Sequence, residues 1–486
     1  MIEATWIYLA IIIWFVAGCI VSHLARRRMG RGVSEYFIAN RKLGGFISAM
    51  TYSATTYSAF MMVGLVGLTY STGVASLGFE LTYLIGTGML LILFAPRFWL
   101  AGKRYQYITP AQLLSGRYEN PLVGAVTTAL CLVMLVPYAS VQFMGIGYLV
   151  ESLSGGTITY MVGCLIVAGV TLIYAWWAGM RSVAWTDAVQ AVIMLATSLF
   201  LLLFIIFTFF GGFGDFIVNV ESSIPSHLTV KWPFTLFLGL SLPWFFFAVT
   251  NPQVTQRLFI PTNVRSLKTM VRGFLIFGFI YTIIVTLFGL AAKIVEPNLK
   301  IADMAMPILL SRTPTLVALL AFVGIVVAAT STLNSIVLTL SSMCSRDIYR
   351  TINPLSSEEK ELLVGKVVIP LMTVACFVFA QLRLELIAVL SSMASAGLLM
   401  QLPAVVGAFF WKRGTAVGAL SSIAIGGIIV GGMLIAGWYP LGHWPGVWGL
   451  AASSLIFVGV SLLTEPPKRA EEFLRNINEA LKTHNM

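Results

Sequence analysis

Long apolar runs separated by short polar segments dominate the hydrophobic pattern of this chain. Each run is long enough to cross a hydrocarbon layer of about 30 Å. Thirteen such runs cover residues 6–24, 45–70, 75–101, 122–151, 157–177, 184–210, 234–256, 270–292, 315–343, 363–382, 386–411, 415–437 and 447–464. The pattern predicts an all-α integral membrane protein of about thirteen transmembrane helices.

The basic residues between the apolar runs predict how the helices are oriented. With the N-terminus outside, 25 Lys and Arg residues fall on the inner side and 5 on the outer side. This asymmetry agrees with the positive-inside rule. The first apolar run precedes the basic residues Arg26, Arg27 and Arg28, which is the reverse of a cleaved signal peptide. We expect a plasma (inner) membrane protein with an outer N-terminus and a cytoplasmic C-terminus.

Two of the apolar runs carry signs of a broken helix. In 45–70, seven hydroxyl side chains fall within the eight residues 51–58, and in 234–256 the pair Asn251-Pro252 interrupts the run. Proline removes an amide hydrogen and frees a carbonyl. Each break alone is equally consistent with a simple kink. Because the breaks lie five spans apart, together they predict an inverted-repeat secondary transporter with a site near the membrane midplane.

A polar stripe follows one face of the apolar run 315–343. Its members recur at three- and four-residue steps, which places them on one side of a helix. They are Ala328, Ser331, Thr332, Ser335, Thr339 and Ser342. Facing the bundle interior, with carbonyls freed in the broken run 45–70, these oxygens would suit a hard cation such as Na⁺. The alternative, that the small residues only pack against a neighbouring helix, remains open.

Two carboxylates, Glu80 and Asp187, fall inside predicted spans. A charge at the bilayer centre costs roughly 2.5–3.5 kcal/mol, so each carboxylate is a candidate functional group. Two alternatives remain open. Glu80 could be a rim residue that contacts solvent, and Asp187 could form an interfacial ion pair with Arg181.

The composition narrows the class of protein. With 58% hydrophobic and only 10% charged residues, the chain does not match a soluble domain. The excess of 30 Lys and Arg over 19 Asp and Glu lies in loops, so a nucleic-acid partner is not expected. The five cysteines have no zinc or disulfide spacing, and hydrolase, metalloprotease and P-loop motifs are absent from the sequence. We therefore expect no enzyme and no catalytic residue, and no obligate protein partner is evident.

Five segments resemble the sodium:solute symporter family of proline, pantothenate, monocarboxylate, sialic acid and glucose carriers. They are SEYFIANRKLGG, MMVGLVGLTYSTG, YAWWAGMRSVAWTDAVQ, NPQVTQRLFIP and AATSTLNSIVLTLSSMCSRDIY, within about Ser34 to Arg413. The resemblance implies a LeuT-like five-plus-five inverted repeat with one extra helix before it and two after. The repeats would be 45–211 and 212–414, preceded by an N-terminal helix and inner loop in 1–44. Two peripheral helices in 415–464 and a cytoplasmic tail in 465–486 would follow.

The resemblance also implies where Na⁺ binds. The principal site would consist of the carbonyls of Ala54, Tyr57 and Ala328 and the hydroxyls of Ser331 and Thr332. Some members bind a second Na⁺, and the corresponding residues here are Asp187, Asn334 and Ser335. Asn334 stands where the family has a hydroxyl. Na⁺ would be the coupling ion, and no other cofactor is expected.

The substrate positions implied by the resemblance come from several helices. Glu80 falls where a sugar-binding member has a Glu, and Tyr138 and Trp244 are similar to positions that line the pocket of the proline carriers. Gln142 lies four residues after Tyr138, so helical spacing puts both on one face. A helix–helix contact is the alternative role for Gln142.

Two departures from the proline carriers leave the solute open. Thr56 stands where those carriers have an Asp, and Ala248 stands where they have a Tyr. The resemblance implies Na⁺-coupled import of a small polar organic solute by alternating access. The solute could be an organic acid, an amino acid, a pantothenate-like compound or a sugar. Proton coupling through Asp187 or Glu80 and a non-transporting membrane sensor are the alternatives, and the expected partners are the solute, Na⁺ and the lipid bilayer.

Overall fold

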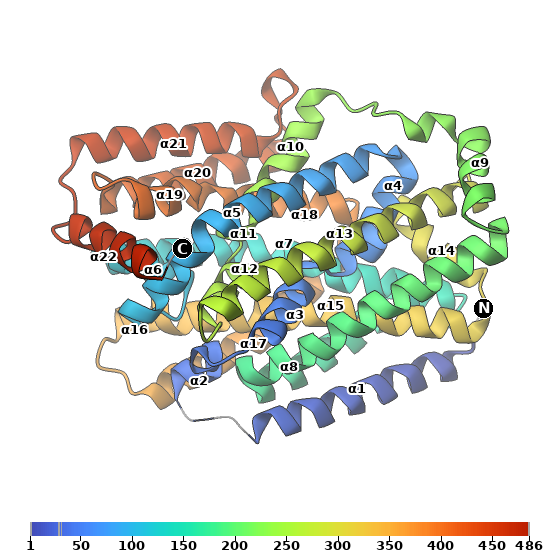
Figure 1. Cartoon of the computed structure of the whole chain (residues 1–486), viewed down its shortest axis with the longest axis horizontal. Coiled ribbons are helices and arrows are strands. Elements are labelled where there is room, and N and C mark those ends of the chain that lie inside the picture. The colour runs from blue at the N-terminus through green and yellow to red at the C-terminus, as the bar shows by residue number, and fades with distance from the viewer. Residues whose placement is uncertain (1, 28–29, 31, 485–486) are drawn as a thin grey trace.

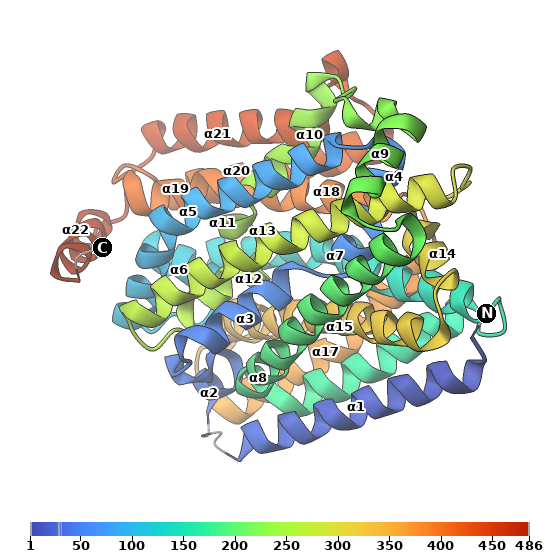
Figure 2. The same cartoon turned by 45° about the vertical axis from the view of Figure 1, so that its right-hand side comes forward.

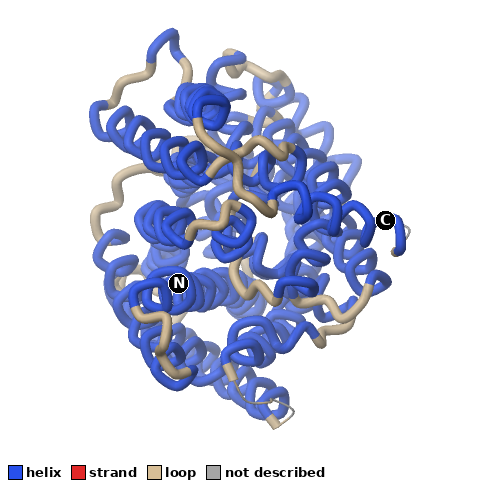
Figure 3. The backbone as a smooth tube through the Cα atoms, turned by 90° about the vertical axis from the view of Figure 1, so that its left-hand side faces the viewer, coloured by secondary structure: helices blue, strands red, loops and turns tan. Residues whose placement is uncertain are grey.

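The chain folds into helices joined by short loops. The computed structural model describes residues 2–27, 30 and 32–484, and within them it contains no strand, only one isolated bridge between Leu43 and Pro261. Figure 3 shows helices and loops throughout. Most long helices run along one common axis, and α22 lies at the opposite end of the bundle from the start of α1 (Figure 1). The predicted all-α fold class is confirmed for the described residues.

Ten helices of the described residues are long and apolar enough to cross a membrane. Their elements are α1 (Ala4–Arg26), α5 (Ala75–Tyr105), α7 (Pro121–Leu153), the second arm of α8 (Tyr160–Phe210), α13 (Val264–Val295), α15 (Thr315–Met343), α17 (Glu358–Ala380), α18 (Ile387–Leu398) with α19 (Leu402–Phe410), α20 (Ala416–Ala436) and α21 (Pro445–Leu463). The other three expected spans contain shorter apolar helices, Phe60–Thr72, Tyr160–Trp176 and Phe234–Phe245. The count of thirteen spans therefore stays a prediction.

Smaller helices cap and connect these spans. They are α2 (Val33–Ile38), α6 (Pro110–Arg117), α9 (Phe213–Ser223), α14 (Ala305–Ser311), α16 (Arg350–Ile352) and α22 (Ala470–Thr483). In both cartoon views α20 and α21 lie together on one side of the bundle, and α1 lies on the opposite side (Figures 1 and 2). Among the spans, those that contain α15, α18 with α19, and α13 are the most deeply buried.

Helix α15 forms the centre of the bundle. Every residue from Gly324 to Ser345 is buried, and α15 packs against α3, α7, α8 and α17. Because α15 is buried all round, burial alone does not distinguish its polar stripe from its other faces. The partners of the stripe make that distinction.

The first expected break is confirmed, and it lies between α3 (Gly45–Thr56) and α4 (Val66–Thr72). Tyr57 leaves the helical conformation with φ −91° and ψ 111°, and the chain resumes through a π-helical turn over Phe60–Leu65. Within α3, the hydroxyls of Ser53 and Thr56 donate to the carbonyls of Ala49 and Tyr52. Such local bonds compete with the helix ladder, which helps to end the helix here.

The second expected break is also confirmed. After α10 (Phe234–Phe245) and α11 (Phe247–Thr250), Asn251 is extended with φ −95° and ψ 110°, and α12 (Pro252–Thr255) begins on the proline. A proline is favourable at the first helical position, where its missing amide hydrogen costs nothing. The Thr255 hydroxyl then donates to the carbonyls of Ala248 (3.1 Å) and Asn251 (3.0 Å) across the break.

A third interruption bends α8 at Gly179, where φ is +64° and ψ 173°. Glycine adopts this conformation without a steric penalty. The expected spans 157–177 and 184–210 are therefore the two arms of one bent element. The neighbouring Arg181 forms an ion pair with Glu35 of α2, with Nη2 lying 3.1 Å from Oε2. The alternative that Arg181 pairs with Asp187 is wrong.

The close packing of α4 on α13 gives a test of this arrangement. A Cβ atom on Gly289 would lie 2.4 Å from Thr69 Cβ and 2.8 Å from the Val66 carbonyl oxygen. We expect Gly289→Ala to destabilise the protein by roughly 1–3 kcal/mol, because overpacking forces the helices apart. The readout is the thermal unfolding midpoint of the purified protein in detergent.

Gly432→Ala in α20 is the matched control, since nothing lies within 4 Å of its added Cβ. Its expected effect lies between no change and about 1 kcal/mol of stabilisation from helix propensity. Equal losses in the two variants would contradict the packing of α4 against α13.

Candidate functional site

The polar stripe of α15 meets the broken end of α3. Ser331 Oγ donates to the Ala54 carbonyl at 2.9 Å and to the Ala328 carbonyl at 3.0 Å. Thr332 Oγ1 donates to the same Ala54 carbonyl at 3.0 Å. All of these residues are buried. The last carbonyls of a helix lack intrahelical partners, and here α15 supplies the partners from the side.

The oxygens of this junction belong to residues that the sequence predicts for Na⁺. Hydrogen bonds connect Ala54, Ala328, Ser331 and Thr332, and Tyr57 is the first residue beyond the end of α3. The Tyr57 ring stacks on Phe274 of α13, with ring centroids 5.6 Å apart. The hydroxyls and carbonyls are neutral, hard oxygen donors. Clusters of three or more His, Cys, Asp or Glu that could hold a metal are absent from the described part of the chain.

Asp187 lies beside this junction, on α8. Its Oδ2 accepts a 2.6 Å hydrogen bond from Thr51 Oγ1 of α3, whereas its Oδ1 has no hydrogen-bond partner. Gln190 Oε1, one turn further along α8, and Asn334 Oδ1 of α15 are also buried without a partner. No hydrogen bond between described residues joins Asp187 to Asn334 or Ser335. The residues expected for a second ion are buried, and of these Asp187 and Ser335 form hydrogen bonds with α3.

Ser335 is already engaged by other groups. Its Oγ lies 2.9 Å from Thr55 Oγ1 and accepts from Arg257 Nη2 at 2.6 Å. Arg257 is fully buried in the turn after α12, and it also donates to the Gln253 carbonyl at 3.1 Å. Arg257 directly follows the expected span 234–256 and is one of the 25 basic residues expected on the inner side, but its guanidinium lies in the protein interior and not in an exposed loop.

Gln256, the residue before Arg257, also binds the polar stripe of α15. It accepts from Thr339 Oγ1 at 2.7 Å and donates to Ser342 Oγ at 2.8 Å. Sequence reasoning missed both Gln256 and Arg257. The available signal was the polar-rich segment NPQVTQR, which begins at the second break and carries five polar side chains in seven residues. Ser331 and Thr332 of the α15 stripe therefore bind the first broken helix, and Thr339 and Ser342 bind the segment after the second break. Ser335, between them, contacts both.

Glu80 lies in the interior, with 1% of its surface exposed. The alternative that it is a rim residue in contact with solvent is wrong. Glu80 lies on α5 three residues before Tyr83, and its Oε2 has no hydrogen-bond partner. Trp244 packs against the same two tyrosines at centroid distances of 5.6 and 6.2 Å. The structure therefore brings Tyr138 and Trp244 together, beside the turn of α5 that carries Glu80 and Tyr83.

Gln142 contacts the first break directly. Its Oε1 accepts from the Ala59 amide at 3.1 Å, and its Nε2 donates to Ser58 Oγ at 3.3 Å. This is the helix–helix contact that the sequence leaves open as an alternative. Gln142 satisfies an amide that the break exposes, and a role in substrate binding stays a prediction.

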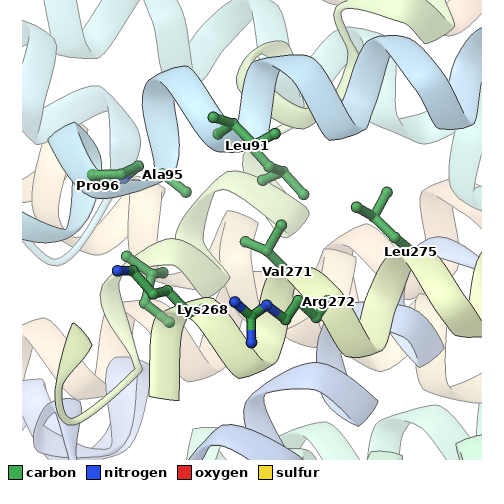
Figure 4. A pocket seen from close by; sticks show the side chains of 9 residues that line it. Leu91, Ala95, Pro96, Lys268, Val271, Arg272 and Leu275 are labelled. Atoms are coloured by element: carbon green, nitrogen blue, oxygen red, sulfur yellow. The ribbon is translucent and has the colours of Figure 1, made fainter. Parts of the chain in front are cut away.

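A groove of about 420 Å³ lies between α5 and α13, away from the breaks. Its wall is mostly apolar, including Leu91, Val271 and Leu275, and the basic side chains of Lys268 and Arg272 lie along one edge (Figure 4). Apolar walls with basic groups at one end are typical of a surface that faces lipid. The groove therefore lacks the polar groups that a small polar solute requires.

Solved structures match this arrangement of helices. The fold is similar to that of a substrate-bound, outward-open Na⁺-coupled sialic acid symporter, with a TM-score of 0.81 at 18% sequence identity over 95% of this chain and 99% of that chain. A nucleobase-cation-symport-1 family transporter in a closed conformation matches with a TM-score of 0.56 at 12% identity over 91% of this chain and 98% of that one. The LeuT-like fold is thereby shown.

Curated relatives and a family model agree with the fold. A sodium/pantothenate symporter of Haemophilus influenzae is 28% identical over 86% of this chain and 88% of its own length. The high-affinity proline transporter PutP of Bacillus subtilis is 27% identical over 93% of this chain and 97% of its own length. The model of the sodium:solute symporter family matches residues 36–426. These relatives are a symporter and a transporter, and the chain belongs to the sodium:solute symporter family.

Proposed function

We propose that this chain is a Na⁺-coupled secondary active symporter that imports a small polar organic solute by alternating access. The observation that carries the proposal is the convergence of the Ser331 and Thr332 hydroxyls on the Ala54 carbonyl. Relatives described as sodium/pantothenate and sodium/proline symporters support Na⁺ as the coupling ion. The principal Na⁺ ligands would be Ala54, Tyr57, Ala328, Ser331 and Thr332.

The chemistry of these oxygens favours a monovalent ion. Hard cations prefer oxygen ligands, and sites for divalent ions draw on several carboxylates. Every proposed ligand at Ala54, Ala328, Ser331 and Thr332 is neutral, so the site does not overcompensate a single positive charge. Bound Na⁺ would tie α3 to α15 in the outward-open state. Opening inward would separate the two helices and release the ion, which is a population shift driven by differential affinity.

The driving force is sufficient for scavenging a solute. One charge that crosses about 100 mV releases about 2.3 kcal/mol. A Na⁺ gradient of about tenfold adds about 1.4 kcal/mol. Together, about 3.7 kcal/mol sustains a solute accumulation of a few hundredfold for each ion, at about 1.4 kcal/mol per decade.

We further place the protein in the plasma (inner) membrane, with the N-terminus outside and the C-terminus in the cytoplasm. An odd number of crossings puts the two termini on opposite sides, and α22 lies at the other end of the bundle from the start of α1 (Figure 1). The two breaks support inverted repeats at 45–211 and 212–414, since each interrupts the first span of its repeat. The flanking segments would be 1–44, 415–464 and 465–486.

Transport with one Na⁺ is the simpler stoichiometry for this chain. A second ion would need Asp187, Asn334 and Ser335. The Ser335 hydroxyl instead accepts from the Arg257 guanidinium, which also interacts electrostatically with Asp187. A fixed positive group therefore already offsets the Asp187 charge. Proton coupling is the second candidate, because Asp187 and Glu80 each hold a buried oxygen without a hydrogen-bond partner.

Removal of either hydroxyl tests the Na⁺ site. We expect Ser331→Ala or Thr332→Ala to raise the Na⁺ concentration for half-maximal uptake by about 10- to 100-fold, because a ligand to a charged group contributes roughly 1.5–3 kcal/mol. The measurement is Na⁺-dependent uptake in proteoliposomes. Thr330→Ala is the matched control, since the Thr330 hydroxyl bonds only to the Val326 and Val327 carbonyls of its own helix. Unchanged Na⁺ dependence in both hydroxyl variants would show that the site is wrongly assigned.

The identity and number of coupling ions are tested by replacing Na⁺ with K⁺ at fixed pH. We expect uptake to cease in K⁺ and to rise hyperbolically with Na⁺ concentration, with a Hill coefficient near 1, because one ion binds. Asp187→Asn should keep that hyperbolic shape. Uptake that continues in K⁺ and follows a pH gradient would support proton coupling, and a sigmoidal Na⁺ response that Asp187→Asn makes hyperbolic would show a second ion.

A further inference from the structure

A buried carboxylate, that of Glu80, lies on α5 next to a cluster of aromatic rings beside the two breaks. We define the aromatic chamber as the rings of Phe60, Phe79, Tyr83, Tyr138, Trp244 and Phe247. Trp244 stacks on Phe60 at 4.6 Å and on Phe247 at 5.0 Å, and Tyr83 and Phe79 approach it edge-on at 5.6 and 6.1 Å. Glu80 follows Phe79 on α5 and lies three residues before Tyr83. One acidic group therefore lies beside a set of closely packed aromatic rings.

The negative charge of Glu80 has no positive partner among the described residues. None of the ion pairs there involves Glu80, and its Oε2 has no hydrogen-bond partner. The charge of Asp187, by contrast, has partners, since Asp187 accepts from Thr51 and interacts with the positive charge of Arg257. A fully buried carboxylate is strongly disfavoured unless a cation or a proton offsets its charge.

The surroundings of Glu80 select the kind of cation. Na⁺ requires several oxygen ligands, which the junction at Ala54 provides and the aromatic chamber largely lacks. An ammonium group binds instead to the faces of Trp and Tyr rings, and aromatic cages are the usual site for quaternary ammonium ligands. The Tyr83 and Tyr138 hydroxyls are also buried without partners, so they are available to donate to a second polar group of the same solute.

We propose that the imported solute carries an ammonium group, either a protonated amine or a quaternary nitrogen, that binds between Glu80 and the rings of the aromatic chamber. This inference rests on the proposed symport and narrows its solute to a zwitterion or a cation. A solute with a negative charge and no cationic centre would be repelled by Glu80.

The experiment measures thermal stabilisation of the purified full-length protein in Na⁺ by five probes. L-proline and glycine betaine carry a secondary and a quaternary ammonium, choline is a cation, pantothenate is an anion and D-glucose is neutral. We expect stabilisation by at least one ammonium compound and by neither pantothenate nor glucose. Glu80→Gln should weaken the apparent affinity for that compound at least 10-fold, and Glu80→Asp should weaken it less. The two zwitterions together show whether the site takes an amine or a quaternary nitrogen.

Glu296→Gln is the matched control for the same chemical change, because Glu296 pairs with Arg312 in a partly exposed ion pair away from the chamber. A further measurement needs no variant and stays valid if Glu80→Gln fails to fold. It compares choline with its carbon isostere, in which a quaternary carbon replaces the quaternary nitrogen. If choline is the compound that binds, we expect the isostere to bind at least 10-fold more weakly; for another ammonium compound its own uncharged isostere serves in the same way.

The inference is overturned if none of the ammonium compounds stabilises the protein, if pantothenate or glucose does so, or if the uncharged isostere binds as well as the charged compound. Its failure is distinct from failure of the proposed function. Stabilisation by an ammonium compound that is equal in Na⁺ and K⁺ would reject Na⁺ coupling and keep the ammonium site. Stabilisation by Na⁺ alone, with no response to any ammonium compound, would keep the ion site and reject this one.

Discussion

The structure depends on one carbonyl, that of Ala54, which accepts hydrogen bonds from Ser331 and Thr332 of α15. A broken helix in an apolar interior leaves backbone groups without partners, and each such group is costly where water is absent. The hydroxyl stripe of α15 removes that cost for α3. The break in α3 therefore depends on the stripe for its hydrogen bonds. In the proposed Na⁺-bound state, the Ala54 carbonyl would coordinate the ion in place of accepting these hydrogen bonds.

The second break uses the same central helix. Arg257 and Gln256 bind Ser335, Thr339 and Ser342 further along the stripe. Both broken helices thus make polar contacts with α15, along the part of this helix that is fully buried. A displacement of either broken helix relative to α15 must exchange buried hydrogen bonds. Such an exchange would give the proposed alternating access two discrete arrangements instead of a continuous deformation.

The sequence predicted the features that depend on local pattern. Apolar length located the helices, Asn251-Pro252 located one break, and helical spacing identified the stripe that contains Ser331. Features that depend on contacts between distant segments were not predictable. Arg257 is a charged residue at the end of an apolar run, where a loop is expected. Its burial depends on an acceptor from a distant segment, the Ser335 hydroxyl. In the same way, Gln142 lies on the expected face, but its partner is an amide that only the fold brings near.

The first break also connects the ion junction to the aromatic chamber. Ala54 lies just before the extended residue Tyr57, and Phe60 begins the turn just after it and stacks on Trp244. Neutral oxygens on one side of this short segment suit a small hard ion, and rings with a carboxylate on the other side suit an organic cation. The two sites differ in ligand type, so neither cargo competes well for the other site. Because the proposed ion ligands Ala54 and Tyr57 and the chamber residue Phe60 lie on one short segment, occupation of one proposed site would change the affinity of the other. Such coupling is reciprocal by thermodynamic necessity.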